Sequence, residues 1–391
     1  MKGKTMLKRR HVLSLVISSV LVSGCGGGGN SSDGGSNDVT PPIIFDVSGV
    51  VQKGPLQPGS VVTLHELNDK MEQTGKSFDS QVQNYDGSYA ISENLNSDFV
   101  EVFSKGYFYN ELSDDSSKEL TLSSYYELKP KSTLSINIVT TLIKGKLKKL
   151  ILEQKLPFSE ASKLATKELL EIYGYSESKT PDFYTVSLQQ DSDAAAILLA
   201  MSSLTLYLSD MNGIEPTTQI ALLANYLEED NLEKIEETKS KLLQANKEID
   251  TFTIESNVTS YFQDHGLDFD APSLLYFIDN DGDGKLPDKT TPILQGYSVA
   301  AAMPNIGETV EIELPIKVYD YQGRNWQQWP IDVSLKPMFG TVEIMPSEQG
   351  WTATYTTTIK EQIDRIDDHF TTEVITPDGV SNSITLHVAM F

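Results

Sequence analysis

Residues 279–284 carry three carboxylates at alternate positions, those of Asp279, Asp281 and Asp283, and end at Gly284. A hard cation the size of calcium takes six to eight oxygen ligands at about 2.3–2.6 Å, and a tight turn at glycine folds alternate side chains onto one centre. Lys285 follows, and a backbone carbonyl at this position ligates whatever the side chain is. The spacing therefore predicts a calcium site.

The first half of this segment matches an EF-hand loop, but the second half departs from it. Position twelve is Thr290 rather than a bidentate glutamate, and Pro287 stands where an exiting helix would continue. The segment is more similar to the shortened calcium loops of dockerin-like and thrombospondin-type repeats, and this resemblance implies that Asp288 completes the shell. Binding would then be weak, at about 10⁻⁴ to 10⁻³ M, and structural. The alternative is an acidic turn that binds no ion.

All three tryptophans, Trp326, Trp329 and Trp351, lie near the C-terminus. Aromatic faces in a loop can stack on sugar rings, and Trp326 and Trp329 lie beside Gly323 and Pro330, which favours exposure. These two residues are therefore the candidate ligand-binding face. The competing interpretation, which we favour, is that Trp351 and one other tryptophan fill a core.

Sequence motifs for nucleophilic or metal-dependent hydrolysis are missing. The chain has no Gly-x-Ser-x-Gly elbow and no His-Glu-x-x-His motif. The sequence therefore assigns no catalytic residue and favours a non-enzymatic binding or adhesion module at the outer membrane or cell surface. A glycan-active hydrolase stays open as an alternative because carboxylates are abundant and paired carboxylates suffice for that chemistry. A scaffold subunit of an envelope complex is a further alternative.

The N-terminus has the three-part layout of an export signal, with positive residues from Lys2 to Arg10, the apolar run Val12–Val22 and then small residues. That run is too short to span a bilayer, which takes roughly 20 apolar residues. Residues 22–25, Val-Ser-Gly-Cys, resemble a bacterial lipobox. The resemblance implies that residues 1–24 are removed and that Cys25 carries a diacylglycerol and an N-linked acyl chain such as palmitate.

Cys25 is the single cysteine, so an intramolecular disulfide cannot form. Gly26 rather than aspartate follows it, which by resemblance to sorted lipoproteins implies the outer membrane, with either orientation open. Residues 25–45 are rich in glycine and serine and predict a flexible tether. Loss of the signal takes the net charge from −24 to about −29. Such a charge argues against nucleic acid and against anionic headgroups, and it fits cationic partners or metal ions better. A glycan or a protein is the expected ligand, and the membrane is contacted through the lipid anchor.

Residues 46–128 alternate β-forming residues with turn signals such as Pro58-Gly59 and Asp86-Gly87, which predicts a β-sandwich. The order of Gly49-Val50-Val51, Pro58-Gly59 with a Val-x-Leu strand, Asp86-Gly87 before Tyr89, and Gly106-Tyr107 resembles the transthyretin-like, carboxypeptidase-regulatory-like domain. Members of that family serve mainly as structural or binding modules.

Residues 129–272 change to a helical period and predict an α-helical bundle. The stretch Ala194–Leu208 is apolar on most faces and is expected at its buried centre, whereas Asn231–Ile249 is expected to be the most exposed helix. Residues 144–149 hold four lysines, which we interpret mainly as the solvated face of a helix.

Residues 273–292 form the predicted calcium-loop linker, and residues 293–391 return to strand patterning. The order of Gly340-Thr341-Val342, Tyr355 and Asp378-Gly379 before Ser381 resembles the immunoglobulin-like or cadherin-like domains of bacterial surface proteins. The whole chain is thus expected to be a multidomain α+β protein. It would hold an N-terminal β-sandwich, a central helical bundle and a C-terminal immunoglobulin-like sandwich, with calcium stiffening the joint before the last.

Overall fold

The computed structural model describes residues 43–129, 132–175, 180–296, 299–302, 304–314, 316–347, 350–360, 366–376 and 381–390. The described chain is mixed α+β, as expected, with seven α-helices and several β-sheets. Cys25, the export signal and most of the predicted tether lie outside the described residues. So do residues 377–380 of the C-terminal motif.

Six strands build the N-terminal region: β1 (Ile43–Gln52), β2 (Val61–Leu67), β3 (Gln73–Gln81), β4 (Ser88–Leu95), β5 (Phe99–Tyr107) and β6 (Glu119–Glu127). Strands β3-β2-β5-β6 form one antiparallel sheet, and β1 pairs with β4 in a second. Along β2, Val62 and Leu64 are buried while Val61 is exposed, so the period of two follows the pleat. The strands occupy the positions that alternation predicted.

The chain leaves these sheets through two short strands, β7 (Ser132–Thr133) and β8 (Ile136–Asn137), which both pair in parallel with β1. Asn137 then caps the first helix: its side-chain oxygen accepts the backbone N–H of Thr140 at 3.0 Å, and Thr140 Oγ1 accepts the N–H of Asn137 at 3.0 Å. This reciprocal capping box starts the helical region directly from the sheet.

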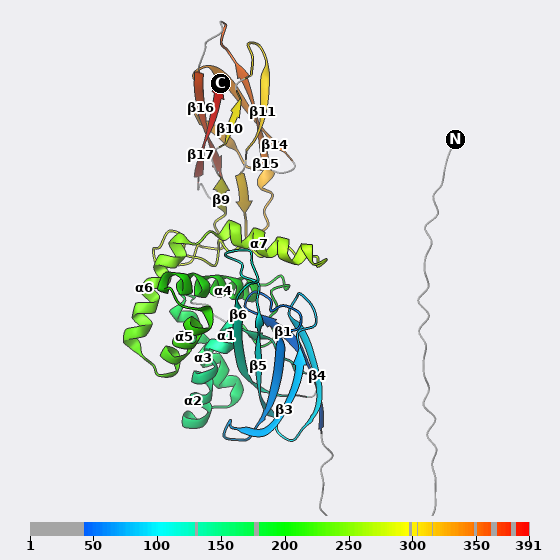
Figure 1. Cartoon of the computed structure of the whole chain (residues 1–391). Helices are drawn as coiled ribbons and strands as arrows, with labels where there is room; N and C mark the ends of the chain where they lie inside the picture. Colours follow the sequence, from blue (N-terminus) through cyan, green and yellow to red (C-terminus); the bar gives the residue numbers. More distant parts are fainter. Residues whose placement is uncertain are drawn as a thin grey trace, which may run out of the picture. The chain divides into compact units, whose positions relative to one another are not determined.

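The helices are α1 (Ile138–Leu142), α2 (Lys144–Gln154), α3 (Phe158–Ile172), α4 (Asp193–Asn212), α5 (Pro216–Glu228), α6 (Leu232–Glu248) and α7 (Thr251–Asp264). Helix α4 contacts α1, α5 and α6, while α1, α2 and α5 contact β6. In Figure 1 the helices lie beside the N-terminal strands. Helix α4 is long and apolar enough to cross a membrane, yet 78% of its most apolar stretch is buried inside the protein. It is the buried helix that the sequence predicts.

One continuous hydrophobic cluster runs from Phe45 to Ile278 and unites the sheets with the helices. Polar groups cross the same junction. Lys53 forms a fully buried ion pair with Glu111 at 2.9 Å, and Glu111 also accepts hydrogen bonds from Ser202 and Ser203 of α4. The N-terminal strands and the helices therefore share one core.

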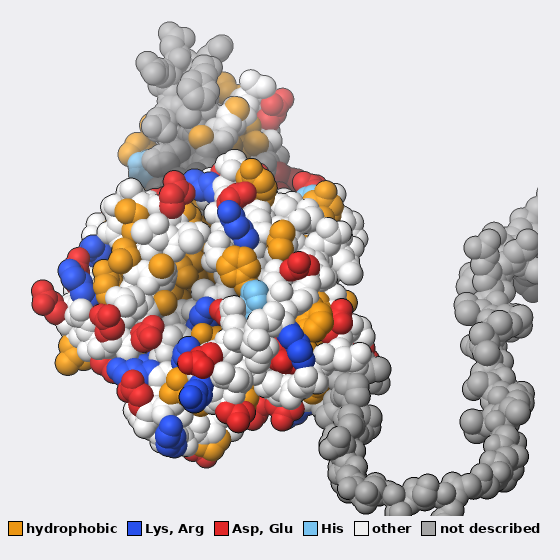
Figure 2. All heavy atoms as spheres, turned by 60° about the horizontal axis from the view of Figure 1, so that its bottom comes forward, with side chains coloured by type: hydrophobic (Ala, Val, Ile, Leu, Met, Phe, Trp, Pro, Cys, Tyr) orange, Lys and Arg blue, Asp and Glu red, His pale blue; other side chains and the backbone are white. Residues whose placement is uncertain are grey.

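Three lysines of α2 form ion pairs with carboxylates, which goes beyond the solvated face that the sequence predicts. Lys146 is buried and pairs with Glu168 of α3 at 2.9 Å and with Asp230, which follows α5. Lys149 also pairs with Asp230, at 2.8 Å. These ion pairs connect α2 to its neighbours. On the face shown in Figure 2, acidic and basic side chains are interspersed rather than gathered by sign.

The C-terminal region holds β9 (Ile293–Gly296), β10 (Ala300–Ala302), β11 (Thr309–Leu314), β12 (Ile316–Tyr319), β13 (Ile331–Leu335), β14 (Gly340–Ser347), β15 (Gly350–Thr357), β16 (Ile366–Ile375) and β17 (Ser381–Met390). They form the sheets β10-β17-β16-β13 and β11-β15-β14 and the pair β12-β9. A second hydrophobic cluster lies between them and centres on Trp351, Tyr355 and Phe370.

Candidate metal site and the predicted ligand face

The predicted calcium loop lies against helix α6. The backbone N–H of Asp279 donates to the side-chain oxygen of Asn246 at 3.1 Å, and the Asn246 amide donates to the carbonyl of Leu242 at 2.8 Å. Asn246 and Asp279 are both buried. A buried amide satisfied on both sides fixes the start of the loop to the helix.

The three aspartates converge as predicted. One carboxylate oxygen from each of Asp279, Asp281 and Asp283 lies within 4.8 Å of those of the other two. The two oxygens of Asp279 accept the N–H groups of Gly282 at 2.7 Å and Gly284 at 2.9 Å, which wraps the loop around this carboxylate. The carboxylates of Asp281 and Asp283 are solvent-exposed, so the group is open on one side.

Glycine suits position 282 because its φ of +69° lies in the left-handed region, which disfavours side chains. A Cβ there would lie 1.5 Å from Cε of Lys247, but the end of that flexible side chain can move away, so the backbone angle is what favours glycine. Gly284 has a φ of +83° and open space around it. The Asp-Gly-Asp-Gly order thus closes the turn without strain.

The electrostatics of the loop suit a cation. Burial raises the pKa of Asp279, and the neighbouring Asp281 carboxylate adds to the rise, while the backbone donors of Gly284 and Gly282 oppose it. Mutual repulsion of close carboxylates is relieved by a bound cation, which also holds them ionised. Three carboxylates at this spacing could supply three of the six to eight oxygens that calcium takes.

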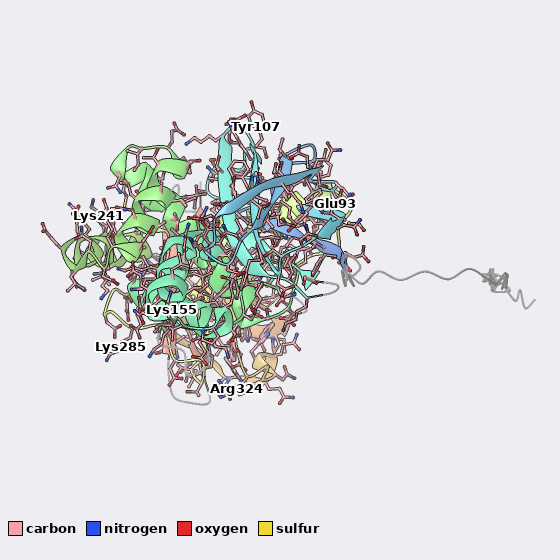
Figure 3. The ribbon with its side chains drawn as sticks, turned by 90° about the horizontal axis from the view of Figure 1, so that it is seen from below. Glu93, Tyr107, Lys155, Lys241, Lys285 and Arg324 are labelled. Atoms are coloured by element: carbon pink, nitrogen blue, oxygen red, sulfur yellow. The ribbon has the colours of Figure 1, made fainter. Side chains whose placement is uncertain are left out.

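One of the predicted carboxylate ligands, Asp288, stands apart from this group. Asp288 is exposed, and its Oδ1 accepts the backbone N–H and the hydroxyl of Thr290, both at 2.8 Å. It is not a member of the carboxylate group. Lys285 is exposed at the outer edge of the helical region (Figure 3), and its backbone N–H donates to Asp283 Oδ1 at 2.8 Å. The structure therefore brings together Asp279, Asp281 and Asp283 and leaves Asp288 outside, and ligation by the backbone carbonyl of Lys285 stays a prediction.

The expectation that Trp329 is exposed is wrong. Its side chain is 7% exposed and belongs to the C-terminal hydrophobic cluster. Trp326 is half-buried, with its ring centroid 4.9 Å from that of the fully buried Trp351. Pro330 and Gly323 mark a turn, but they do not determine which way the rings point. The favoured alternative, that Trp351 and one other tryptophan fill the core, is confirmed.

Asn246 contacts the predicted calcium loop, and nothing in the sequence indicated this contact. It lies on α6, whose many glutamates and lysines predict an exposed helix, and it carries no motif of its own. Its role becomes visible only once the chain has brought residues 246 and 279 together.

The chain matches none of the family models against which it was scanned, and a search of curated proteins finds no match either.

Proposed function

We propose that this chain is a lipid-anchored, non-enzymatic binding protein of the bacterial outer membrane that uses calcium as a structural ion. The observation that carries the calcium half is the convergence of Asp279, Asp281 and Asp283 within 4.8 Å, on a loop fixed to α6. The lipid anchor rests on the lipobox-like residues that end at Cys25. We also propose that the N-terminal β region is a transthyretin-like domain and that the C-terminal β region is an immunoglobulin-like domain.

The position of the loop explains why the ion would be structural. Asp193, the first residue of α4, joins the segment after the loop to the C-terminal β region: Lys289 pairs with this carboxylate at 2.6 Å, and the Tyr321 hydroxyl donates to it at 2.6 Å. The hydroxyl of Tyr276 lies 2.8 Å from the carbonyl of Tyr319. The segment joins α7 to the C-terminal strands. A cation that orders residues 279–284 would therefore help to keep these contacts formed.

Thermal unfolding of the mature chain with and without calcium tests the metal proposal. Millimolar calcium should raise the Tm of the wild type, and Asp281→Ala should abolish this rise. Asp288→Asn is the matched control, since Asp288 lies outside the carboxylate group, and it should keep the rise. An unchanged Tm of the wild type on addition of calcium would remove the proposal.

The lipid anchor is tested separately by mass spectrometry and cell fractionation. The mature N-terminus should be Cys25 carrying the lipid, and Cys25→Ser should release the protein from membranes. An unmodified thiol on a cytosolic chain would contradict the anchor without bearing on the calcium loop.

A further inference from the structure

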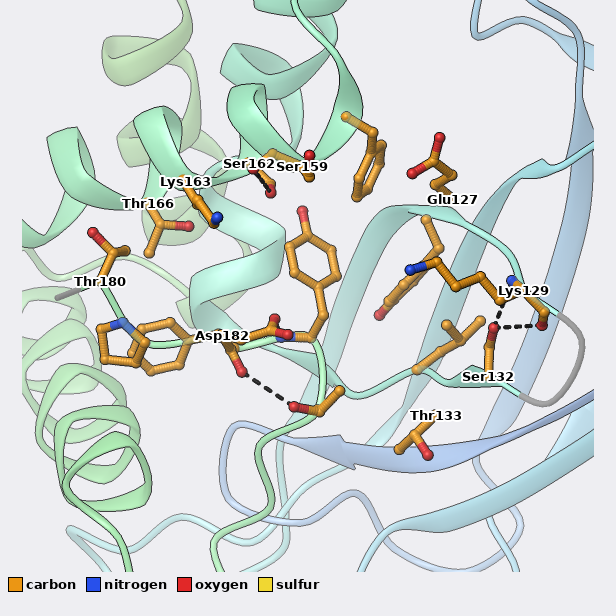
Figure 4. Close-up of a pocket in the computed structure, with 17 residues that line it drawn as sticks. Glu127, Lys129, Ser132, Thr133, Ser159, Ser162, Lys163, Thr166, Thr180 and Asp182 are labelled. Carbon is orange, nitrogen blue, oxygen red and sulfur yellow. Dashed lines mark hydrogen bonds between the residues drawn. The ribbon is translucent and has the colours of Figure 1, made fainter.

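A cavity of about 350 Å³ lies where the N-terminal sheets meet helix α3 (Figure 4). Its wall comes from the end of β6, from β7, from the first two turns of α3 and from residues 180–185. The volume is at the small end of the usual range for ligand pockets, roughly 300–1,000 Å³, and suits one ring-sized molecule.

Two lysines face this cavity from opposite sides. Figure 4 shows Lys129 extending inward from the sheet side and Lys163 inward from α3. Neither ammonium group forms an ion pair within the described part of the chain. By contrast, Lys144, Lys146 and Lys149 are all paired with carboxylates. The charges of Lys129 and Lys163 balance those of Glu127 and Asp182 in the same lining, and each ammonium group stays available to pair with a negative group of a ligand.

Helix α3 adds to the positive potential. Its N-cap is Pro157, whose side chain makes no capping hydrogen bond, and the helix runs for 15 residues. Amide groups at an uncapped helix N-terminus carry partial positive charge and bind anions. Ser159 and Ser162 lie in this first part of the helix and line the cavity.

The rest of the wall is built from aromatic rings, hydroxyls and acceptors. Tyr184 packs edge-on against Tyr126 at 5.4 Å and against Phe158 at 5.6 Å between ring centroids, which gives the cavity a rigid aromatic side. Glu127 and Asp182 supply carboxylate oxygens. The carboxylates can accept hydrogen bonds from the hydroxyls of a sugar, and the aromatic rings can pack against its C–H face. A bare inorganic anion has neither of these groups.

We propose that this cavity binds a single sugar unit that carries a negative charge, with Lys129 and Lys163 pairing with the anionic group. Glu127 and Asp182 accept hydrogen bonds from the sugar hydroxyls, and the aromatic side packs on the ring. This assignment names the ligand class of the binding function proposed above and rests on it. It also replaces Trp326 and Trp329 as the proposed ligand site with the cavity between the N-terminal sheets and α3.

The experiment is a titration of the full mature chain with glucuronate, glucose 6-phosphate, glucose and inorganic phosphate, monitored by ligand-detected NMR. Glucuronate or glucose 6-phosphate should bind at least tenfold more tightly than glucose and than phosphate, and the preference between them distinguishes carboxylate from phosphate. Lys129→Gln and Lys163→Gln should each weaken binding about tenfold, because a hydrogen bond to a charged group is lost. Lys70→Gln, which changes an exposed lysine outside the cavity, should leave it unchanged.

Failure of this inference can be told apart from failure of the metal proposal. The cavity contains none of the loop aspartates, so Asp281→Ala should bind the anionic sugar like the wild type even if it loses the calcium response. Absence of binding by the wild type, equal binding of glucose, equal binding of phosphate, or full binding by both lysine variants would each overturn the assignment.

Discussion

The side-chain nitrogen of Lys53 lies 2.9 Å from a carboxylate oxygen of Glu111, and both side chains are fully buried. Ser202 and Ser203 of α4 complete the surroundings of Glu111, and the Ser202 hydroxyl also donates to the carbonyl of Lys53. Asn257 of α7 donates to the Glu111 carbonyl at 3.0 Å. Three parts of the chain, the N-terminal strands, α4 and α7, thus meet at one ion pair.

Removing one member of this pair should destabilise the protein strongly. Lys53→Met leaves the Glu111 carboxylate buried without its cation, and loss of one partner of a buried pair costs about 3–5 kcal/mol. The free energy of unfolding in urea measures the effect. The double variant Lys53→Met with Glu111→Leu should recover part of the loss because no uncompensated charge remains. A Lys53→Met protein as stable as the wild type would show that the pair does not hold the junction.

A comparison of two glycines in turns can distinguish the cost of a left-handed backbone from the cost of a steric clash. Gly59 and Gly87 have similar φ angles, +88° and +83°, but a Cβ at Gly59 meets open space whereas one at Gly87 would lie 2.4 Å from the carbonyl oxygen of Val51. Gly59→Ala should cost about 1–2 kcal/mol, the penalty of a left-handed alanine. Gly87→Ala should cost about 2–5 kcal/mol because β1 must also shift. Equal losses in chemical denaturation would contradict this account.

Calcium binding should depend on pH through Asp279. Its pKa is raised in the folded protein, so the folded state holds this proton more tightly than the unfolded state does. Without calcium, the stability contributed by this group is present below the ordinary aspartate pKa of about 3.9 and is lost as pH rises through the raised value. Calcium needs the ionised carboxylate, so its affinity should rise over the same interval.

Calorimetric titrations at several pH values between about 4 and 7 measure this dependence. Binding should release protons near the raised pKa, and Asp279→Asn should abolish both binding and proton release. Without calcium, the unfolding temperature of the wild type should fall relative to that of this variant as pH rises through the interval, because only the wild type loses the contribution of Asp279. Proton release that is unaffected by Asp279→Asn would assign the titration to another carboxylate.

Trp329 and Trp326 should differ in their structural importance. Trp329→Ala removes a buried ring from the C-terminal cluster and should cost about 3–5 kcal/mol. Trp326 is half-buried against Trp351, so Trp326→Ala should cost clearly less. Hydrogen exchange of the β15 amides reports on this region, and it should speed up much more in the first variant. A larger effect from Trp326→Ala would reverse the assignment of the core ring.

Hydrophobic patterning predicted these elements because burial alternates along strands such as β2 and is continuous along the central helix α4. Val62 and Leu64 show the period of two in β2, and the apolar stretch Ala194–Leu208 lies within the buried α4. Periodicity identifies an apolar face but not the surface that covers it. That the face of β6 meets α1, α2 and α5 in one shared core, with Lys53 and Glu111 inside it, depends on contacts between residues far apart in the sequence, such as Lys53 and Ser202, which are 149 positions apart.

The metal loop was predictable in its first half and not in its second. Asp279, Asp281 and Asp283 converge because their spacing and glycines act within six residues. Asp288 lies beyond the local turn, and its hydrogen bonds to Thr290 direct it elsewhere. The cavity beside α3 had no sequence signal, since Lys129 and Lys163 come from segments that only the fold brings together.

The apolarity of α4 would set a constraint on the timing of the export that we propose for this chain. Before the N-terminal strands and the other helices enclose it, this 20-residue segment satisfies the length and composition of a stop-transfer sequence. In the export that we propose, the whole segment would have to clear the translocation channel before it partitions sideways into lipid. The polar residues within it, Ser202, Ser203 and Thr205, reduce its affinity for hydrocarbon while serving as hydrogen-bond donors inside the folded protein.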